Sequence, residues 1–206
     1  MVLMNDMEYQ ERMNQVIQHY DTVRKCGDGL NPDSIGWYHK EWIPIRFKSF
    51  MKLRTSNNIL DFGCGIGLLY EYMKVNNIDT SEYYGCDINP RFLRYCKDVI
   101  GDNHIFDNFP YGEHFDNVFG IGAICDWTYK NDTTEHVLKQ CWDVTNKVMA
   151  FSFNSTIVKR RTGKGYFPSV RWLLDIASNM SDYYELIITP LEYEMILVVY
   201  RDDENE

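Results

Sequence analysis

A glycine-rich loop between a short strand and a helix constrains this sequence more than any other feature. The loop follows the apolar stretch 59–62, and its residues are Asp61, Phe62, Gly63, Cys64, Gly65, Ile66 and Gly67. Glycines allow the backbone to turn tightly and let a ligand approach it, while the next helix offers unpaired amides at its N-terminus. The pattern therefore predicts a ligand site at the carboxyl end of a buried strand.

The rest of the chain alternates between strands and helices. Apolar periodicity predicts two helices before the loop, at 4–24 and 37–53. After it we expect a helix through Met73, further helices over 90–99, 133–145 and 168–180, and strands over 59–62, 82–87, 103–106, 115–124, 148–153, 183–188 and 193–200. The last two strands are joined by residues 189–192 alone, too short a link for a parallel crossover, so we expect them to pair antiparallel. This order indicates an α/β fold with helices on both faces of the sheet.

A second acid, Asp87, follows the loop at the end of the next expected strand. A carboxylate there can accept hydrogen bonds from both hydroxyls of a ribose. The loop spacing differs from the Gly-x-Gly-x-x-Gly of dinucleotide sites, and Asp61 would repel a pyrophosphate. S-adenosylmethionine has no phosphate and carries two cationic groups, so the acids favour that cofactor.

The segments 59–67 and 84–90 resemble the first two motifs of class I S-adenosylmethionine-dependent methyltransferases. The resemblance extends from about residue 35 to 201, and segments 35–42, 150–156 and 193–201 are similar to a small bacterial and phage subfamily without a well-defined substrate. It implies a Rossmann-like seven-stranded sheet of order 3-2-1-4-5-7-6 with strand seven antiparallel. It also implies S-adenosylhomocysteine as the product.

The same resemblance assigns residues to the cofactor. The three loop glycines would line its methionyl part, Asp87 its ribose and Ile88 one face of its adenine, with Asp107 and Asn108 at the adenine edge. The expected cofactor-binding residues are Asp61, Gly63, Cys64, Gly65, Gly67, Asp87, Ile88, Asp107 and Asn108.

The acceptor is expected beyond the carboxyl ends of the fourth and fifth strands. No Asn/Asp-Pro-Pro-Tyr motif follows the fourth strand, which disfavours amino-directed methylation of DNA or protein. Asp126 there and His39 before the core are the candidate catalytic groups; a helix cap or loop acid is the alternative for Asp126. By resemblance, the aromatic cluster around His39 would form a lid, although its tryptophans could simply pack on the sheet.

The basic run 159–164 follows the fifth strand and could clasp a phosphate or carboxylate, or remain a solvated loop. Arg46 could reach a carboxylate of cofactor or acceptor, with a surface ion pair as the alternative. The candidate substrate-binding residues are Trp37, Tyr38, Arg46, Trp127, Asn154, Arg160 and Arg161.

The whole chain has 206 residues and a formal charge of −9, which disfavours a broad nucleic-acid surface. Its six cysteines form no C-x-x-C pair and no metal-like pattern, so we expect reduced thiols, no metal and a cytoplasmic protein. We expect an N-terminal helical extension or lid (1–54), a methyltransferase core (55–201) and an acidic tail (202–206).

The expected reaction is an in-line transfer of a methyl group to a small polar or anionic acceptor. Two alternatives stay open. One is a nucleic-acid or protein methyltransferase that uses the 159–164 run, and the other is a non-catalytic protein that senses S-adenosylmethionine or acts as an assembly partner. No membrane partner is expected, because no stretch of ~18 apolar residues occurs.

Overall fold

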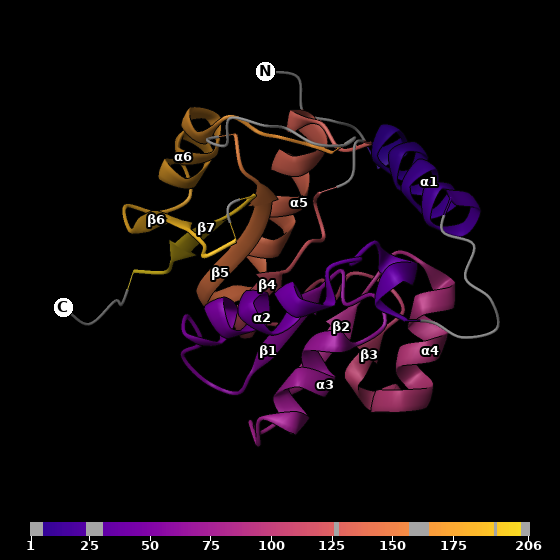
Figure 1. The fold of residues 1–206 in the computed structure, drawn as a ribbon. Coiled ribbons are helices and arrows are strands. Elements are labelled where there is room, and N and C mark those ends of the chain that lie inside the picture. Colours follow the sequence, from indigo (N-terminus) through magenta and orange to yellow (C-terminus); the bar gives the residue numbers. More distant parts are fainter. Residues whose placement is uncertain (1–5, 24–30, 126–127, 157–164, 192, 203–206) are drawn as a thin grey trace.

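A seven-stranded sheet forms the centre of the computed structural model, which describes residues 6–23, 31–125, 128–156, 165–191 and 193–202 (Figure 1). Its strands lie in the order β3-β2-β1-β4-β5-β7-β6, so the expected order is confirmed. The strands are β1 (Ile59–Phe62), β2 (Tyr83–Cys86), β3 (Ile105–Phe106), β4 (Phe115–Gly120), β5 (Thr145–Asn154), β6 (Tyr184–Ile188) and β7 (Glu194–Tyr200).

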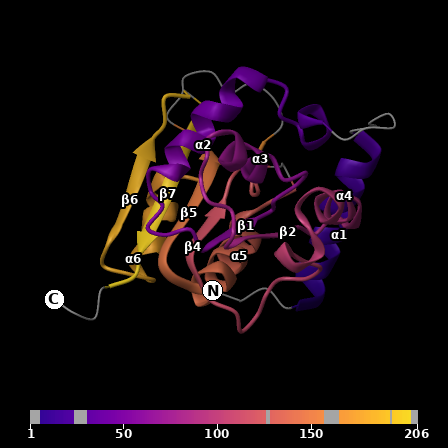
Figure 2. The same ribbon diagram turned by 90° about the horizontal axis from the view of Figure 1, so that it is seen from below.

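The strands from β3 to β5 pair in parallel, whereas β7 is antiparallel to both of its neighbours, β5 and β6. The short link between β6 and β7 requires this geometry, because it leaves no room for a helical crossover. Figure 2 shows β6 and β7 at one side of the sheet and β1 and β2 toward the other.

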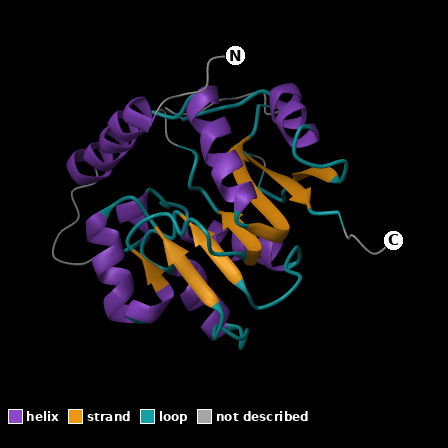
Figure 3. Ribbon diagram, turned by 180° about the vertical axis from the view of Figure 1, so that it is seen from behind, coloured by secondary structure: helices purple, strands orange, loops and turns teal. Residues whose placement is uncertain are grey.

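Helices cover both faces of the sheet, as Figure 3 shows from behind. The helices are α1 (Asp6–Val23), α2 (Ile43–Met51), α3 (Leu68–Val75), α4 (Pro90–Ile100), α5 (Asn131–Asp143) and α6 (Val170–Ser178), with short 3-10 helices at Pro32–Ile35, Lys40–Trp42 and Asp102–His104. Side chains of α2 and α3 share one buried apolar cluster with β1 and β4, and those of α1, α5 and α6 share another on the opposite face. None of the described helices combines the length and apolarity that crossing a membrane requires.

Five strands are shorter than the sequence predicts, and the third and fourth differ for reasons that the structure shows. The third, expected over 103–106, has only the two residues of β3, because Asp102–His104 forms a 3-10 turn in which the His104 ring nitrogen Nδ1 lies 2.8 Å from the Tyr83 carbonyl oxygen. The fourth, expected to run to Ile124, ends at Gly120. The chain then turns, and Gly122 adopts a left-handed φ of 72°.

Helix α1 crosses the edge of the sheet at which the parallel strands end. Arg12 bonds Asp132 in the first turn of α5, with Nη2 2.8 Å from Oδ2. Near the other end of α1, Asp21 Oδ1 accepts a hydrogen bond of 3.1 Å from Asn89 Nδ2, at the start of α4. Because α4 and α5 begin just beyond β2 and β4, these two contacts hold α1 over the carboxyl ends of the strands.

Candidate functional site

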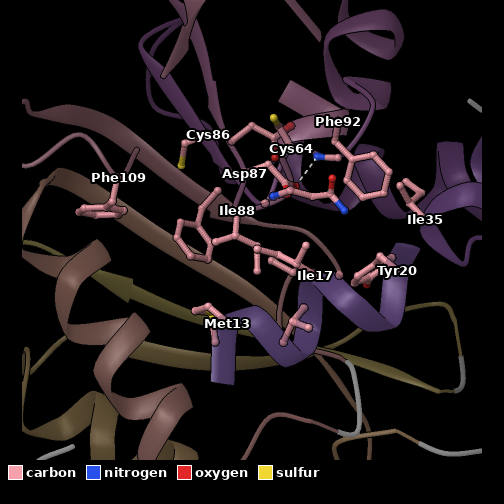
Figure 4. Close-up of a pocket in the computed structure, with 18 of the residues that line it drawn as sticks. Met13, Ile17, Tyr20, Ile35, Cys64, Cys86, Asp87, Ile88, Phe92 and Phe109 are labelled. Atoms are coloured by element: carbon pink, nitrogen blue, oxygen red, sulfur yellow. Dashed lines mark hydrogen bonds between the residues drawn. The ribbon is translucent and has the colours of Figure 1, made fainter. Parts of the chain in front are cut away.

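A cavity of about 300 Å³ lies between α1 and the carboxyl ends of β1, β2 and β4 (Figure 4). Its walls come from the glycine loop, the end of β2, residues 107–111, the turn after β4 and one face of α1. This volume is at the lower end of the range of small-molecule sites. The position agrees with the rule that ligands of open α/β sheets bind beyond the carboxyl ends of the strands.

The glycine loop is tied to the end of β2. The backbone amides of Gly63 and Cys64 both donate to the Cys86 carbonyl oxygen, at 2.8 and 3.0 Å. Gly63 has a φ of 72°, and a Cβ atom on it would lie 2.7 Å from Cβ of Ala123, in the turn after β4. A side chain at Gly63 would therefore clash with the cavity wall, and glycine keeps the backbone open to a ligand.

Asp87 faces this loop. Its Oδ2 accepts a hydrogen bond of 2.9 Å from the Gly65 amide, and its Oδ1 accepts one of 2.8 Å from the Asn89 amide. Burial raises the pKa of Asp87 to about 6, although these amide bonds act in the opposite direction. A carboxylate has about four lone-pair sites, so each oxygen keeps acceptor capacity for a hydroxyl group of a ligand.

Asp61 is the second acid of the cavity and is only 4% exposed. Its Oδ2 accepts a hydrogen bond of 2.8 Å from the Tyr83 hydroxyl. Burial raises the pKa of Asp61 to about 7; the Tyr83 bond opposes this shift and the Asp87 charge adds to it. Two carboxyl groups in such a desolvated place favour a cationic ligand, because positive charge would stabilise their ionised forms.

Helix α1 supplies the opposite wall. Figure 4 shows Met13, Ile17 and Tyr20 projecting from α1 toward the side on which Ile88 and Phe92 lie. The rings of Tyr20 and Phe92 meet edge to face, with their centroids 5.8 Å apart. These apolar side chains suit the flat face of a base better than a charged group.

The cavity includes residues that sequence reasoning did not assign to the site. They include Tyr9, Gln10, Met13, Asn14, Ile17 and Tyr20 of α1, together with Phe92, Phe109, Tyr111, Tyr129 and Gln140. The helical spacing of Met13, Ile17 and Tyr20 was visible in the sequence, but a helix can cover any part of a sheet. Tertiary contacts, among them those of Arg12, Asp21 and Tyr20, place this face on the cavity.

The structure brings together most of the expected cofactor-binding set. The members that line the cavity are Asp61, Gly63, Cys64, Gly65, Asp87, Ile88, Asp107 and Asn108. Gly67 is the one expected cofactor-binding residue that does not line the cavity. It caps the start of α3 with a φ of 75°, and a Cβ atom there would lie 2.9 Å from Cδ1 of Ile100, so it serves the turn and the packing of α4.

Of the expected acceptor-side residues, Trp37 lines the cavity. Tyr38 and His39 do not: the Tyr38 side chain is 65% exposed, and the His39 ring stacks on Trp42 at 4.0 Å with Nδ1 3.3 Å from Glu41 Oε1. This arrangement gives no support to His39 as a base, because a general base must reach the proton that it removes.

Arg46 and Asn154 also differ from expectation. Arg46 lies outside the cavity lining and forms an ion pair with Glu194 instead of reaching a ligand carboxylate. Asn154 donates through Nδ2 to the carbonyl oxygens of Cys125 and Tyr166, at 3.1 and 2.9 Å, so its amide fixes the backbone after β4 and β5. Four further candidates lie outside the described residues: Asp126, Trp127, Arg160 and Arg161.

The chemistry of the described lining fits S-adenosylmethionine. Asp87 offers acceptors to ribose hydroxyls, the aromatic and aliphatic wall offers apolar surface to adenine, and the two buried acids favour a cation. No cluster of three or more His, Cys, Asp or Glu side chains that could hold a metal ion occurs in the described part of the chain.

Comparison with known proteins supports the same conclusion. A family model described as a methyltransferase domain matches residues 60–147. No curated protein matches the chain. Among solved structures, magnesium protoporphyrin IX methyltransferase from Synechocystis PCC 6803 with bound S-adenosylhomocysteine has a TM-score of 0.64 at 16% identity, covering 93% of this chain and 100% of its own.

Two further structures are similar. An amino pentose methyltransferase from Micromonospora echinaspora has a TM-score of 0.62 at 11% identity, covering 86% of this chain and 100% of its own. A TehB-like S-adenosylmethionine-dependent methyltransferase from Corynebacterium glutamicum has a TM-score of 0.53 at 17% identity, covering 83% of this chain and 100% of its own. The expected fold and enzyme class are thereby confirmed, with S-adenosylmethionine as the cofactor of such a domain.

Proposed function

We propose that this chain, which has a methyltransferase domain at residues 60–147 and the class I fold, transfers a methyl group from S-adenosylmethionine to a small polar acceptor. The observation that carries the proposal is the position of Asp87 at the end of β2, where it lines the cavity and accepts a hydrogen bond from the Gly65 amide. Bound S-adenosylmethionine supplies a methyl group on a sulfonium. The protein's contribution is to bind, orient and exclude water.

Several of the lining residues have assigned places in this proposal. Asp87 binds the ribose hydroxyls, Ile88 and the 107–108 segment flank the adenine, and Gly63 and Gly65 border the methionyl part. Asp61 supplies negative charge near the cationic groups. Trp37 and the turn after β4 face the acceptor, because that turn follows the carboxyl end of the strand beside β1.

The size and lining of the cavity support a small acceptor over a macromolecule. It is enclosed by α1, and its described lining contains acids, amides and aromatic side chains but no Lys, Arg or His. Positive charge for an anionic acceptor would therefore have to come from residues outside this lining, such as the 159–164 run. The proposal accordingly favours a polar acceptor without net negative charge.

We also propose a cytoplasmic location. Cys64, Cys86, Cys96 and Cys141 are buried thiols without a disulfide, as expected of a protein in a reducing compartment.

Calorimetry with S-adenosylmethionine and S-adenosylhomocysteine tests the cofactor site. We expect Asp87→Ala to weaken binding of both by about 10- to 100-fold, since two charge-assisted hydrogen bonds to the ribose are lost. The matched control is Asp98→Ala, which removes an exposed acid from α4. Unchanged affinity in Asp87→Ala would contradict the assignment of the cavity.

Turnover requires a separate measurement. The protein is incubated with S-adenosylmethionine carrying a labelled methyl group and with a cell extract split by ultrafiltration. Label that enters the small-molecule fraction, and does so less with Asp87→Ala, supports the proposed acceptor class. Label that enters only the macromolecular fraction would overturn that class in favour of a protein or nucleic-acid acceptor. Absence of label in both, under conditions where the cofactor binds, would favour the sensor alternative.

A further inference from the structure

An ion pair between Arg46 and Glu194 lies beside the cavity without lining it. Arg46 Nε, in α2, donates to Glu194 Oε2 at the first residue of β7, although 148 positions separate the two residues in sequence. Their side chains are 17% and 7% exposed. Glu194 Oε1 is buried and accepts no hydrogen bond from the described part of the chain.

Such a pair is a poor way to stabilise a fold. Burial raises the pKa of Glu194, which the Arg46 charge opposes, so the ionised carboxylate is only partly compensated. The residues that follow in β7, from Met195 to Val199, are apolar and almost completely buried. Apolar side chains of similar volume commonly replace buried ion pairs at no loss of stability. The pair is therefore better explained by a positional role than by stability.

Arg46 also contacts Trp37. The guanidinium carbon of Arg46 lies 4.7 Å from the centre of the Trp37 ring, close enough for a cation–π contact. On the cavity side, the Trp37 ring lies against Gly122, where a Cβ atom would come within 3.2 Å of the indole Cζ2 and Nε1. The indole is thus held between Arg46 and the turn that follows β4.

The turn itself is fixed from the sheet. The Gly122 amide donates a 2.8 Å hydrogen bond to Ser152 Oγ in β5, and both Trp37 and Gly122 line the cavity. The indole therefore has a turn bonded to β5 on one side and the guanidinium of Arg46 on the other.

We infer that Arg46 and Glu194 are positioning residues that hold Trp37 as the cavity wall beside the end of β4. Glu194 fixes the guanidinium, the guanidinium fixes the indole, and the indole limits the shape of acceptor that can lie next to the cofactor. The inference rests on the proposed function for its consequence in binding. The contacts among the three residues do not depend on it.

The test replaces the ion pair by apolar side chains in the double variant Arg46→Met with Glu194→Leu. The protein is labelled with 5-fluorotryptophan, and Trp37→Phe identifies the fluorine NMR signal of Trp37. We measure this signal without ligand, the melting temperature, and the affinity for S-adenosylhomocysteine. Lys52→Met is the matched control, because Lys52 is an exposed cation at the C-terminal end of the same helix.

We expect the double variant to keep or raise its melting temperature while the Trp37 signal shifts and broadens and the affinity falls about tenfold. Arg46→Lys, which keeps the charge but loses the planar group over the indole, should shift the signal with little change in melting temperature. Lys52→Met should change none of the three quantities.

Two results would overturn the inference. One is an unchanged Trp37 signal in both the double variant and Arg46→Lys. The other is a loss of affinity that is fully matched by a loss of stability, which would give the pair a structural role only. If the parent protein binds no S-adenosylhomocysteine while the Trp37 signal shifts as expected, the proposed function fails and the positioning of Trp37 stands.

Discussion

Asp61 combines two demands that oppose each other at one residue. The carboxyl group is buried next to Asp87, which raises its pKa to about 7, and it lies where a cationic cofactor gains from negative charge. Because the pKa of Asp61 is higher in the folded than in the unfolded state, the contribution of Asp61 to the free energy of unfolding is fully present only in acid. It is lost as the pH rises through about 7. Above that pH the apoprotein bears the cost of a buried charge.

We therefore predict that Asp61→Asn stabilises the apoprotein and weakens cofactor binding. Asparagine can still accept the Tyr83 hydrogen bond but carries no charge. At about pH 8 the gain in unfolding free energy is expected to reach up to about 4 kcal/mol, and it should vanish below about pH 3, where Asp61 is protonated in both the folded and the unfolded state. Thermal unfolding across this pH range measures it, and an equal melting temperature at all pH values would contradict the prediction.

The affinity of the parent protein should change with pH in the opposite sense. Ionised Asp61 and Asp87 are needed to attract the cation and to accept ribose hydrogen bonds, so affinity should rise as the pH passes through about 6 and about 7. The rise should be steeper for S-adenosylmethionine than for S-adenosylhomocysteine, because only the former carries a sulfonium. Calorimetric titrations of both ligands measure this difference, and flat pH profiles would exclude the two acids as the titrating groups.

The sequence predicts the roles of residues that depend on a local pattern, but not the roles that depend on contacts with distant parts of the chain. The glycine loop and Asp87 carry their own context, namely a strand before and a helix after. The role of Arg46 depends on Glu194, which comes from a strand 148 positions away. Nothing in the spacing of the sequence shows such a partner, so contact with a ligand and an ion pair could not be distinguished.

At the scale of elements, α1 covers the cavity, and two polar contacts tie it to the start of α5 and of α4. Arg12 joins it to Asp132 of α5, and Asp21 joins it to Asn89, whose own amide binds the cofactor-site acid Asp87. Between these two contacts, the face of α1 with Met13 and Ile17 closes the cavity. Movement of α1 would therefore open the cavity further.

We predict that Arg12→Met loosens α1 without unfolding the core. The Arg12–Asp132 pair is partly exposed, so its loss should have a small effect. We expect hydrogen-exchange protection in α1 to fall about threefold and dissociation of S-adenosylhomocysteine to become about threefold faster. Exchange mass spectrometry and stopped-flow fluorescence provide the two measurements. Arg171→Met, an exposed arginine on α6, is the control. Faster dissociation with unchanged protection in α1 would show that the ligand leaves by another route.

Elements were predictable where their hydrophobic periodicity was long, and less so where tertiary contacts set their ends. The hairpin of β6 and β7 follows from its short link alone, and α5 lies within two residues of its expected range. β3 has two residues because His104 turns back to bond the Tyr83 carbonyl group, a contact that no local pattern shows.

At the scale of the whole molecule, the charged residues behind the net charge of −9 differ in their relevance to function. Asp61 and Asp87 lie in a cavity whose walls come from the ends of β1 and β2, the turn after β4 and α1, so a ligand there links elements that are distant in sequence. A ligand that binds only the folded state stabilises all of these elements together, because unfolding must release it.

We predict that S-adenosylhomocysteine at about 100 times its dissociation constant stabilises the protein by about 2.7 kcal/mol. For a chain of this length, that corresponds to a rise of about 5–10 °C in melting temperature. Asp98→Ala should show the full rise, while Asp87→Ala at the same ligand concentration should show at most about half of it, because its affinity is about 10- to 100-fold lower. Adenosine, which has the ribose but no methionyl part, should give a smaller rise that Asp87→Ala also removes. An equal rise in both variants would mean that the ligand binds elsewhere, because Asp87 contacts only a ligand in this cavity.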